Sequence, residues 1–390
     1  MIVGICAPIA VTPLTPWLDV TAGTRLPEGM GGTPVVALVR GLLERGHRVV
    51  IFTLDRSVSD EVVLAGERLK ICIGPYRHAH RARDLFRTER EYLVSAIRRE
   101  RPELVHAHWT YEFALAALDS GRPTVVTAHD APLQVLRHIG DAYRAARLLM
   151  AWKVARRAEH LTAVSDYIGG HFRKVLRYSH LISVVPNAVP DELFELGASR
   201  GRSREANGVA IATVLNGWGQ LKNASVALKA FGELRRRMPQ ARLLMFGVDY
   251  GRGETAQRWA RARGLAEGVE FAGEVAYEQL HRRLACEADI LLHPSREESF
   301  SMAVAEAMAL RLAVIGGARA GAVPSLLEDG RVGELADVTS TKSVAAALLK
   351  LANNRALREE LGDAAGQSAR SRFRTAIVVD QYEAIYRTVC

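Results

Sequence analysis

The chain has 390 residues, of which 48% are hydrophobic and 24% are charged. This ordinary globular composition excludes a disordered, collagen-like or coiled-coil protein, and the length predicts two large domains. No run of about 18 apolar residues occurs, so we expect no transmembrane helix, and the segment Met1 to Pro8 is typical of a strand and not of a signal peptide. Four scattered cysteines without a CxxC pair predict neither a disulfide framework nor a zinc site, and they fit a reducing cytoplasm.

The positive charge is concentrated in the first half of the chain. Lys and Arg total 52 against 43 Asp and Glu, a net charge of +9, and nine basic residues between Arg137 and Arg177 face three acidic ones. A second basic stretch runs from Arg77 to Arg101. Such stretches attract anionic lipids or phosphorylated ligands, but they are also typical of solvated helix faces, and both interpretations stay open. Nucleic-acid binding is disfavoured because no aromatic-interleaved or helix-turn-helix context accompanies the basic residues.

Short apolar runs alternate with amphipathic stretches along the first half. Apolar strands separated by helices predict a parallel sheet that is covered on both faces, which is the doubly wound α/β arrangement. The expected strands are 2–7, 48–53, 69–72, 104–106, 124–128, 160–164 and 182–185, and the expected helices include 34–45, 89–101 and 143–157.

The second half repeats this pattern. Strands are expected at 209–215, 241–247, 269–271, 290–293 and 313–315, with helices at 224–237, 256–264, 277–285, 302–310, 344–353, 356–371 and 375–388. The stretch 196–207 is rich in Gly, Ser and Arg, which is typical of a linker. We therefore predict a Rossmann-like domain at 1–190, a linker at 191–206, a second Rossmann-like domain at 207–372 and a terminal helix at 373–390.

The most specific motif is a strand, a turn and a helix with two glutamates. Glu298 lies in the turn after the strand, and Glu306 lies eight residues further on, inside a helix that Ser299 or Ser301 is expected to cap. A turn that ends at a helix N-terminus presents free backbone N–H groups to an anion. A carboxylate in the turn can accept hydrogen bonds from sugar hydroxyls, and one two turns later can reach a ribose diol.

This stretch resembles the E-x7-E motif of family 4 of the glycosyltransferases, which are retaining nucleotide-sugar enzymes of GT-B fold. The resemblance implies two Rossmann-like domains facing each other across a cleft, with a C-terminal helix that crosses back to the first domain. It extends over nearly the whole chain, because further family marks follow in order: Gly31-Gly32-Thr33-Pro34, Arg45-Gly46-His47-Arg48-Val49, Val105-His106-Ala107-His108, His129, Val184-Val185-Pro186-Asn187 and Asn216 to Asn223.

The resemblance also implies roles for individual residues. His129 would contact the donor sugar, Lys222 would clamp the diphosphate leaving group, Glu298 would hold sugar hydroxyls and Glu306 the ribose. The remaining donor-binding positions would be Gly31, Gly32, Gly217, Gly247, Val275, Ser299, Phe300 and Ser301. Gly31 and Gly32 let the backbone approach a diphosphate closely, and we expect Thr33 as the N-cap and Pro34 as the first residue of the helix that follows.

Two departures from the family pattern stand out. The arginine that the family places beside the lysine falls on Gly217 here, and Arg311 and Ala313 replace the usual glycine and proline after the second glutamate. These departures leave open a catalytically degenerate GT-B scaffold, and an epimerase or another nucleotide-sugar enzyme of similar fold is a further alternative. A nicotinamide dehydrogenase is disfavoured because no third-glycine fingerprint follows the first strand.

Together these features predict a retaining glycosyltransferase that uses a nucleotide-diphosphate sugar and no metal cofactor, since no DxD-like acidic pair follows a strand. The expected acceptor is a saccharide or a lipid-linked saccharide, as in the synthesis of cell-surface polysaccharide or glycolipid. The basic helix 143–157 also carries Leu148, Leu149, Met150 and Trp152, which is typical of an interfacial helix. We therefore expect a cytoplasmic protein that contacts the anionic inner face of the cell membrane peripherally.

Overall fold

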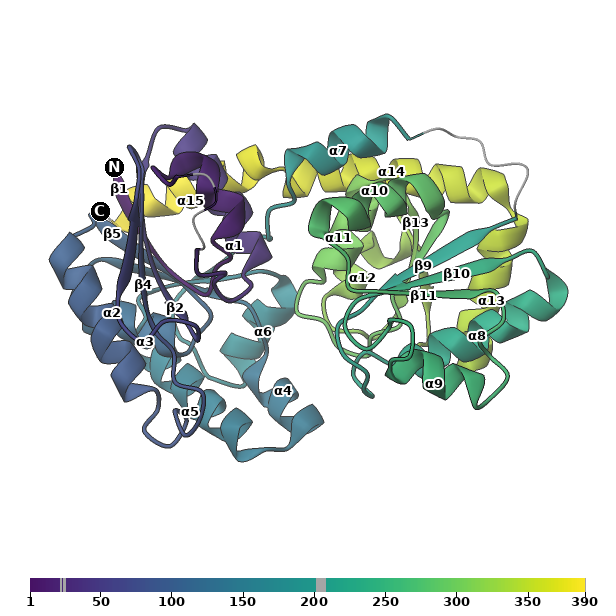
Figure 1. The fold of residues 1–390 in the computed structure, drawn as a ribbon, viewed down its shortest axis with the longest axis horizontal. Helices are drawn as coiled ribbons and strands as arrows, with labels where there is room; N and C mark the ends of the chain where they lie inside the picture. The colour runs from purple at the N-terminus through teal and green to yellow at the C-terminus, as the bar shows by residue number, and fades with distance from the viewer. Residues whose placement is uncertain (22, 24–25, 201–207, 390) are drawn as a thin grey trace. The chain divides into compact units, whose positions relative to one another are not determined.

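A computed structural model describes residues 1–21, 23, 26–200 and 208–389. The chain forms two compact units (Figure 1). Unit 1 comprises Met1–Ala188 together with Thr375–Cys390, and unit 2 comprises Val189–Arg374. The last helix therefore returns to the unit that contains the N-terminus, as the predicted fold class requires.

Unit 1 is built on an eight-stranded sheet with the order β3-β4-β2-β1-β5-β6-β7-β8. All neighbours pair in parallel except β3, which is antiparallel to β4. β3 was not predicted from the sequence; it is a short edge strand of four apolar residues that alternate between half-buried and exposed. The strands are β1 (Ile2–Cys6), β2 (Arg48–Asp55), β3 (Val62–Ala65), β4 (Leu69–Pro75), β5 (Leu104–His108), β6 (Thr124–Ala128), β7 (His160–Ala163) and β8 (Ile182–Val184).

Helices cover this sheet, and the terminal helix is part of its core. They are α1 (Thr33–Glu44), α2 (Arg87–Glu100), α3 (Glu112–Asp119), α4 (Pro132–Ile139), α5 (Ala142–Arg157), α6 (Asp166–Lys174) and α15 (Thr375–Val389), with a 3-10 helix η1 at Thr12–Trp17. Val378, Tyr382 and Tyr386 of α15 are buried in the same apolar cluster as the strands. α15 packs against α1, where Gly41 leaves room for it.

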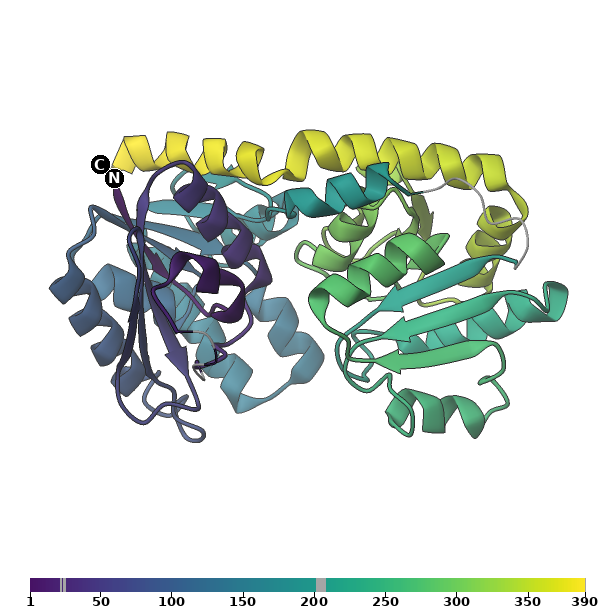
Figure 2. The ribbon, with the colours of Figure 1, turned by 45° about the horizontal axis from the view of Figure 1, so that its top comes forward.

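Unit 2 carries a six-stranded parallel sheet with the order β11-β10-β9-β12-β13-β14. Helices lie on both faces of it (Figure 2), so the doubly wound α/β class is confirmed in both units. The strands are β9 (Ala210–Val214), β10 (Arg242–Phe246), β11 (Val269–Gly273), β12 (Ile290–Leu292), β13 (Ala313–Gly317) and β14 (Glu334–Ala336). The helices are α7 (Asp191–Ala198), α8 (Ala224–Arg237), α9 (Thr255–Arg261), α10 (Tyr277–Glu287), α11 (Met302–Ala309), α12 (Val323–Leu326), α13 (Thr341–Asn353) and α14 (Arg355–Phe373), with a 3-10 helix η2 at Glu328–Gly330.

The predicted linker at 191–206 is wrong for its first part. Residues Asp191–Ala198 form helix α7, which buries Leu193 and Phe194 in unit 2. Arg374 holds the start of this helix through an ion pair of 2.9 Å to Asp191. The composition of 196–207 suggested a loop, but the two apolar side chains before it find a surface to pack on. Residues 201–206 of the predicted linker lie outside the described residues.

Two further findings concern individual segments. The N-cap of α1 is Gly32, with φ of 76°, so Thr33 and Pro34 are the first two helical residues and the cap lies one residue earlier than expected. None of the helices in the described part of the chain combines the length and the apolar character needed to cross a membrane.

We predict that replacing Gly41 with Leu weakens the packing of α15. A Cβ at Gly41 would lie 2.6 Å from a methyl of Val379 and 2.7 Å from a methyl of Thr375, and overpacking of this kind typically costs about 1–3 kcal/mol. Chemical denaturation should show that loss in the free energy of unfolding. Gly170→Leu is the matched control, because this helical glycine has no atom within 4 Å of its Cβ position. Equal stability of the two variants would contradict the proposed packing.

Candidate functional site

The first cluster of unit 2 lies beyond the carboxyl end of β12, where the chain turns into α11. Glu298 accepts a hydrogen bond of 2.7 Å from the Lys222 ammonium, which belongs to the loop after β9. The same oxygen lies 3.1 Å from Nε2 of His293. Burial by itself would raise the pKa of Glu298, but the hydrogen bond and charge of His293 and the Lys222 ammonium outweigh it and lower the pKa to about 2. The structure thus brings the predicted Lys222 and Glu298 together as an ion pair.

The loop that carries Lys222 is held in shape from the neighbouring strand. Gly217 has φ of 83°, its carbonyl accepts a hydrogen bond of 3.0 Å from the Tyr250 hydroxyl, and the Trp218 N–H donates to Asp249 at 2.9 Å. A Cβ at Gly217 would meet no atom within 4 Å, but an arginine there would have to adopt the left-handed backbone region. The backbone conformation at position 217 therefore favours glycine over the arginine that the family pattern places there.

Arg296 is a cation beside this loop that the sequence analysis missed. Its backbone N–H donates to the Leu221 carbonyl at 2.9 Å, which places it next to Lys222 in space. Its Nε is buried without a hydrogen-bond partner, and its guanidinium has no ion pair within the described residues. Arg296 stands two residues before Glu298 in the motif, and only the pairing of its backbone with the β9 loop reveals that it lies near the lysine.

Helix α11 places Glu306 in a second polar cluster. The Tyr277 hydroxyl donates to Oε1 of Glu306 at 2.9 Å, and Nε2 of His281 lies 3.1 Å from Oε2. Both partners come from α10, so the protein itself already contacts both oxygens of this carboxylate. The sequence analysis did not select Tyr277 or His281, because neither lies within a motif.

The residues between the two glutamates differ in what they can offer a ligand. Ser301 is the N-cap of α11 but makes no capping hydrogen bond with its side chain, and its Oγ lies 3.2 Å from Nε2 of His293 instead. Phe300 is 4% exposed and packs edge-on against Phe373, so its side chain belongs to the core, and only its backbone is left for a ligand.

The predicted glycines all have positive φ angles, and Gly32 and Gly247 also lie close to neighbouring backbone. Gly31 and Gly32 have φ of 70° and 76° at the start of α1, and a Cβ at Gly31 would lie in open space. Gly247, with φ of 112°, follows β10, and a Cβ there would collide with the Leu215 carbonyl oxygen. Val275 is half-buried between β11 and α10. These positions are compatible with close approach of a ligand to the backbone.

Three histidines of unit 1 form a buried row, in which His106 and His108 lie on β5 and His129 directly follows β6. Nδ1 of His108 lies 2.9 Å from Nε2 of His129, and Trp109 stacks on the His129 ring at 4.3 Å. His106 contacts the Tyr386 hydroxyl of α15 at 2.7 Å and Thr127 at 2.6 Å. Burial lowers the pKa of His106 and of His129 to about 3 and also lowers that of His108. All three are therefore neutral at physiological pH.

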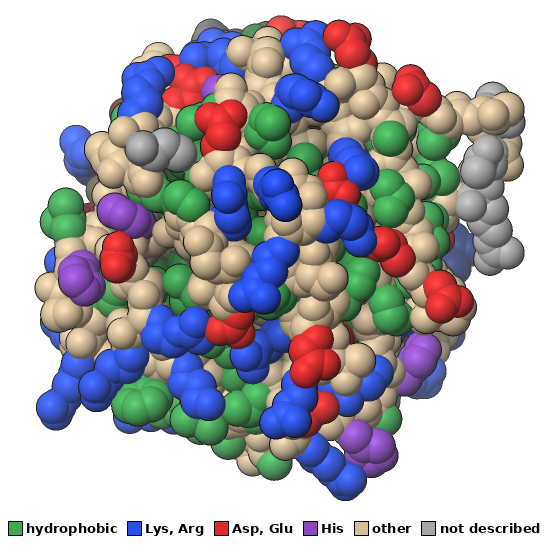
Figure 3. All heavy atoms as spheres, turned by 90° about the vertical axis from the view of Figure 1, so that its left-hand side faces the viewer, with side chains coloured by type: hydrophobic (Ala, Val, Ile, Leu, Met, Phe, Trp, Pro, Cys, Tyr) green, Lys and Arg blue, Asp and Glu red, His purple; other side chains and the backbone are tan. Residues whose placement is uncertain are grey.

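Many of the basic residues of unit 1 have acidic partners. Arg77 pairs with Asp84 at 2.8 Å and with Glu89 at 2.6 Å, and Arg157 pairs with Asp119 at 2.7 Å. On the face of unit 1 seen in Figure 3, acidic side chains lie among the basic ones, and basic side chains gather at the lower left. The solvated-face interpretation therefore accounts for part of the basic stretches.

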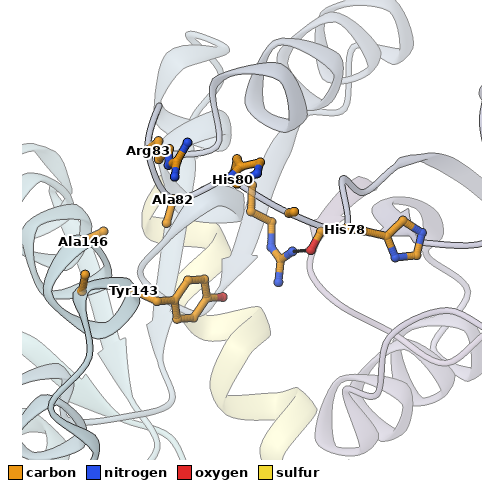
Figure 4. Close-up of a pocket in the computed structure, with 9 residues that line it drawn as sticks. His78, His80, Ala82, Arg83, Tyr143 and Ala146 are labelled. Atoms are coloured by element: carbon orange, nitrogen blue, oxygen red, sulfur yellow. Dashed lines mark hydrogen bonds between the residues drawn. The ribbon is translucent and has the colours of Figure 1, made fainter.

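A shallow pocket of about 440 Å³ lies beside Arg81 and Arg83 of unit 1 (Figure 4). It is formed by the loop 78–83 and the first turns of α5, where Tyr143 faces the loop. The Arg81 guanidinium donates to the carbonyls of Arg77 and His78 and lies 4.5 Å from the centre of the Tyr76 ring. The residues that line the pocket include His78, His80, Arg81 and Arg83 and no acidic residue. It is thus a place where an anionic group would find positive charge.

The described residues contain no group of three or more His, Cys, Asp or Glu side chains arranged to hold a metal ion.

Comparison with known proteins assigns the family. The glycosyltransferase family 4 model matches residues 31–193, and the model of glycosyl transferases group 1 matches residues 199–368. The chain therefore belongs to the family 4-like glycosyltransferases of GT-B fold and is a transferase of glycosyl groups.

Individual proteins similar to this chain agree with that family. N-acetyl-alpha-D-glucosaminyl L-malate synthase of Bacillus anthracis is 24% identical over 76% of this chain and 77% of its own length. Matches to the next two relatives span 50% and 53% of those proteins. Sucrose-phosphate synthase of Thermosynechococcus elongatus has the same fold, with a TM-score of 0.79, 17% identity and coverage of 100% and 99% of the two chains. HepE of Anabaena, solved in complex with UDP and glucose, gives a TM-score of 0.70, 16% identity and 99% coverage of both chains.

We predict that Glu298 stabilises the fold above pH 4.5 and loses this effect in acid. Its pKa is lowered from an ordinary 4.5 to about 2 in the folded protein, so its contribution is present above 4.5 and disappears as the pH falls toward 2. Wild type should exceed Glu298→Gln in free energy of unfolding by roughly 1–3 kcal/mol at pH 6, and the difference should shrink by pH 2.

Glu267→Gln is the control for this titration. Glu267 pairs with Arg235 but is 84% exposed, and an exposed pair contributes about 0–1 kcal/mol. A difference between wild type and Glu298→Gln that stays constant from pH 6 to pH 2 would contradict the ion-pair assignment.

Proposed function

We propose that this glycosyltransferase moves a sugar from a nucleotide-diphosphate sugar to a saccharide or lipid-linked acceptor with retention of the anomeric configuration. The observation that carries the proposal is the cluster at the carboxyl edge of the unit 2 sheet. There a lysine–carboxylate pair of 2.7 Å, the N-terminus of α11 and a second carboxylate on the same helix occur together. The structural relative solved with UDP and glucose supports a nucleotide-sugar donor.

In this proposal positive charge stabilises the departing diphosphate. Lys222 and Arg296 supply two cations, and the backbone N–H groups at the start of α11 add partial positive charge. The bond between the sugar C1 and the diphosphate oxygen breaks, and the acceptor oxygen bonds to C1 from the same face. The acceptor proton passes to a phosphate oxygen of the leaving group. Because the protein itself supplies the positive charge, the proposed chemistry needs no metal.

The carboxylates bind and orient the donor. The low pKa of Glu298, about 2, makes it an acceptor of hydrogen bonds from sugar hydroxyls and unsuited to donate a proton at neutral pH. Glu306 would accept hydrogen bonds from the ribose diol. His129, neutral because burial lowers its pKa to about 3, would contact the donor sugar without adding charge. Gly217, Gly247 and Val275 would leave backbone groups open to the nucleotide.

The pocket of unit 1 supports an acceptor with an anionic group. Its loop presents Arg81, Arg83 and two histidines without an acidic partner. The names of two relatives, the malate synthase and the sucrose-phosphate synthase, also refer to anionic groups. For a lipid-linked acceptor the protein would act at the inner face of the membrane. The exposed side chains of Leu149 and Trp152, 44% and 42% accessible, support this part of the proposal, whereas Met150, which the sequence analysis grouped with them, is buried in the core.

Ligand binding and product analysis test the donor assignment. UDP, GDP and ADP, each with its common sugar conjugates, should be screened by thermal shift, and one nucleotide family should raise the Tm by mass action. With the matching donor and candidate acceptors, the products should be free nucleoside diphosphate and a glycoside that keeps the donor's anomeric configuration by NMR. An inverted product or an isomerised sugar nucleotide would contradict the proposal.

The leaving-group role is tested by alanine variants. Lys222→Ala should lower kcat by about 100-fold or more, and Arg296→Ala by about 10-fold or more, because each removes a charge that acts on the transition state. Lys229→Ala, an exposed lysine of α8, should turn over at the wild-type rate. Wild-type turnover by a folded Lys222→Ala protein would refute the role of this lysine.

Vesicle flotation tests the membrane contact. We expect wild type to float with vesicles that contain anionic lipid, and Leu149→Ser/Trp152→Ser to lose most of this binding because it removes the exposed apolar contacts. Val63→Ser, which changes a 45% exposed apolar side chain on the edge strand β3, is the control. Absence of wild-type flotation would overturn the membrane proposal and leave the donor assignment unaffected.

A further inference from the structure

The side chain of His281, on α10, lies between a backbone carbonyl group and the carboxyl group of Glu306. Nδ1 of His281 lies 2.7 Å from the backbone carbonyl oxygen of Tyr277, and Nε2 lies 3.1 Å from Oε2 of Glu306. The histidine side chain is 1% exposed and the glutamate side chain 8%. The imidazole is thus enclosed between a carbonyl and a carboxyl group.

Hydrogen-bond valence restricts where the protons are. A carbonyl oxygen can only accept, so Nδ1 of His281 must carry a proton. An ionised carboxylate can also only accept, so Nε2 must carry a second proton, or else the carboxyl group carries it and donates to Nε2. In either case one proton lies between Nε2 and Oε2, and the carboxyl group cannot rotate without breaking this contact.

The Tyr277 hydroxyl completes this arrangement by donating to Oε1 at 2.9 Å. Its ring also packs on the His281 ring with centres 4.2 Å apart. Two hydrogen bonds to side chains of one helix therefore hold the two oxygens of Glu306 in a defined plane. Each oxygen keeps a further lone pair that can accept a hydrogen bond from a ligand.

We propose that His281, supported by Tyr277, is a positioning residue that orients the Glu306 carboxyl group for the ribose diol of the donor. This inference rests on the proposed function, which assigns the ribose to Glu306. α10 begins two residues after Val275, a proposed contact of the nucleotide. The same helix therefore follows one proposed nucleotide contact directly and holds the carboxyl group of Glu306, the proposed ribose contact.

Two substitutions of His281, by glutamine and by asparagine, distinguish a role in orienting the Glu306 carboxyl group from a role in packing alone. Glutamine places its NH2 near the position of Nε2 and can still donate to Glu306. Asparagine is shorter, keeps a donor near the position of Nδ1 and cannot reach the carboxylate. Both are polar and similar in size, so loss of packing affects them alike.

The readout is the preference for ribose over deoxyribose. Binding of UDP and 2′-deoxy-UDP, and of GDP and 2′-deoxy-GDP in parallel, is measured by calorimetry for wild type, Glu306→Gln, His281→Gln, His281→Asn and Tyr277→Phe. Because a hydrogen bond to a charged group is at stake, wild type should prefer the ribonucleotide by about 10-fold or more. His281→Asn should lose most of this preference, His281→Gln should keep most of it, and Tyr277→Phe should fall between them. The donor KM should rise in His281→Asn with little change in kcat.

The outcomes distinguish this inference from the proposed function. If wild type and Glu306→Gln show the same preference, Glu306 does not bind the ribose, and both the role of Glu306 and the inference fail. If Glu306→Gln loses the preference but a folded His281→Asn keeps it, the proposed function stands and the positioning role of His281 is refuted. Equal losses in His281→Gln and His281→Asn would also refute it, because the effect would then not depend on a donor to Glu306.

Discussion

A strand buried in a parallel sheet has no room for a charged side chain, and this constraint determines where the polar groups of the protein lie. The strands β1, β6, β9 and β12 contain no charged side chain. Polar side chains then follow directly, His129 after β6 and His293 after β12. Because the carboxyl ends of neighbouring parallel strands share one edge, residues far apart in the sequence, such as Lys222 and Glu298, meet there.

The charges at this edge are balanced within the protein. Glu298 has a lysine and a histidine as partners, and Glu306 has a tyrosine and a histidine. Burying an ionised carboxylate is costly unless it is paired and hydrogen-bonded, so these partners keep the acids in place. The same partners orient the carboxylates in advance, which spares the reorganisation that a flexible side chain would need when it binds a donor.

The basic character of unit 1 has two components with different physical meaning. Arg77 and Arg157 are neutralised by neighbouring acids and tie the loops and helices of unit 1 together. The loop at 78–83 instead gathers His80 and Arg83 at a pocket without acidic lining. Net charge alone cannot separate these cases, because it counts a paired and an unpaired arginine alike.

The sequence by itself determined the fold class, the family and most element positions. Apolar runs of strand length and the spacing of Glu298 and Glu306 are local patterns, which can be recognised in the sequence without knowledge of long-range contacts. It also predicted Lys222 and Glu298 as partners of one ligand, but not that they bond to each other. The edge strands β3 and β14 and the helix α7 were not predicted; each is short, and its place in the fold is set by packing on its unit.

Only the tertiary structure decided which side chains support the predicted ones. Arg296 enters the site through a backbone hydrogen bond to the loop after β9, and His281 of α10 enters it through its contact with Glu306 of α11. It also showed that the side chains of Phe300, a predicted donor-binding residue, and of Met150, an apolar residue of the predicted interfacial helix, are buried. The physical reason is the same in each case: the partner of a side chain across a sheet or between two helices is set by the packing of distant segments, and no local periodicity records it.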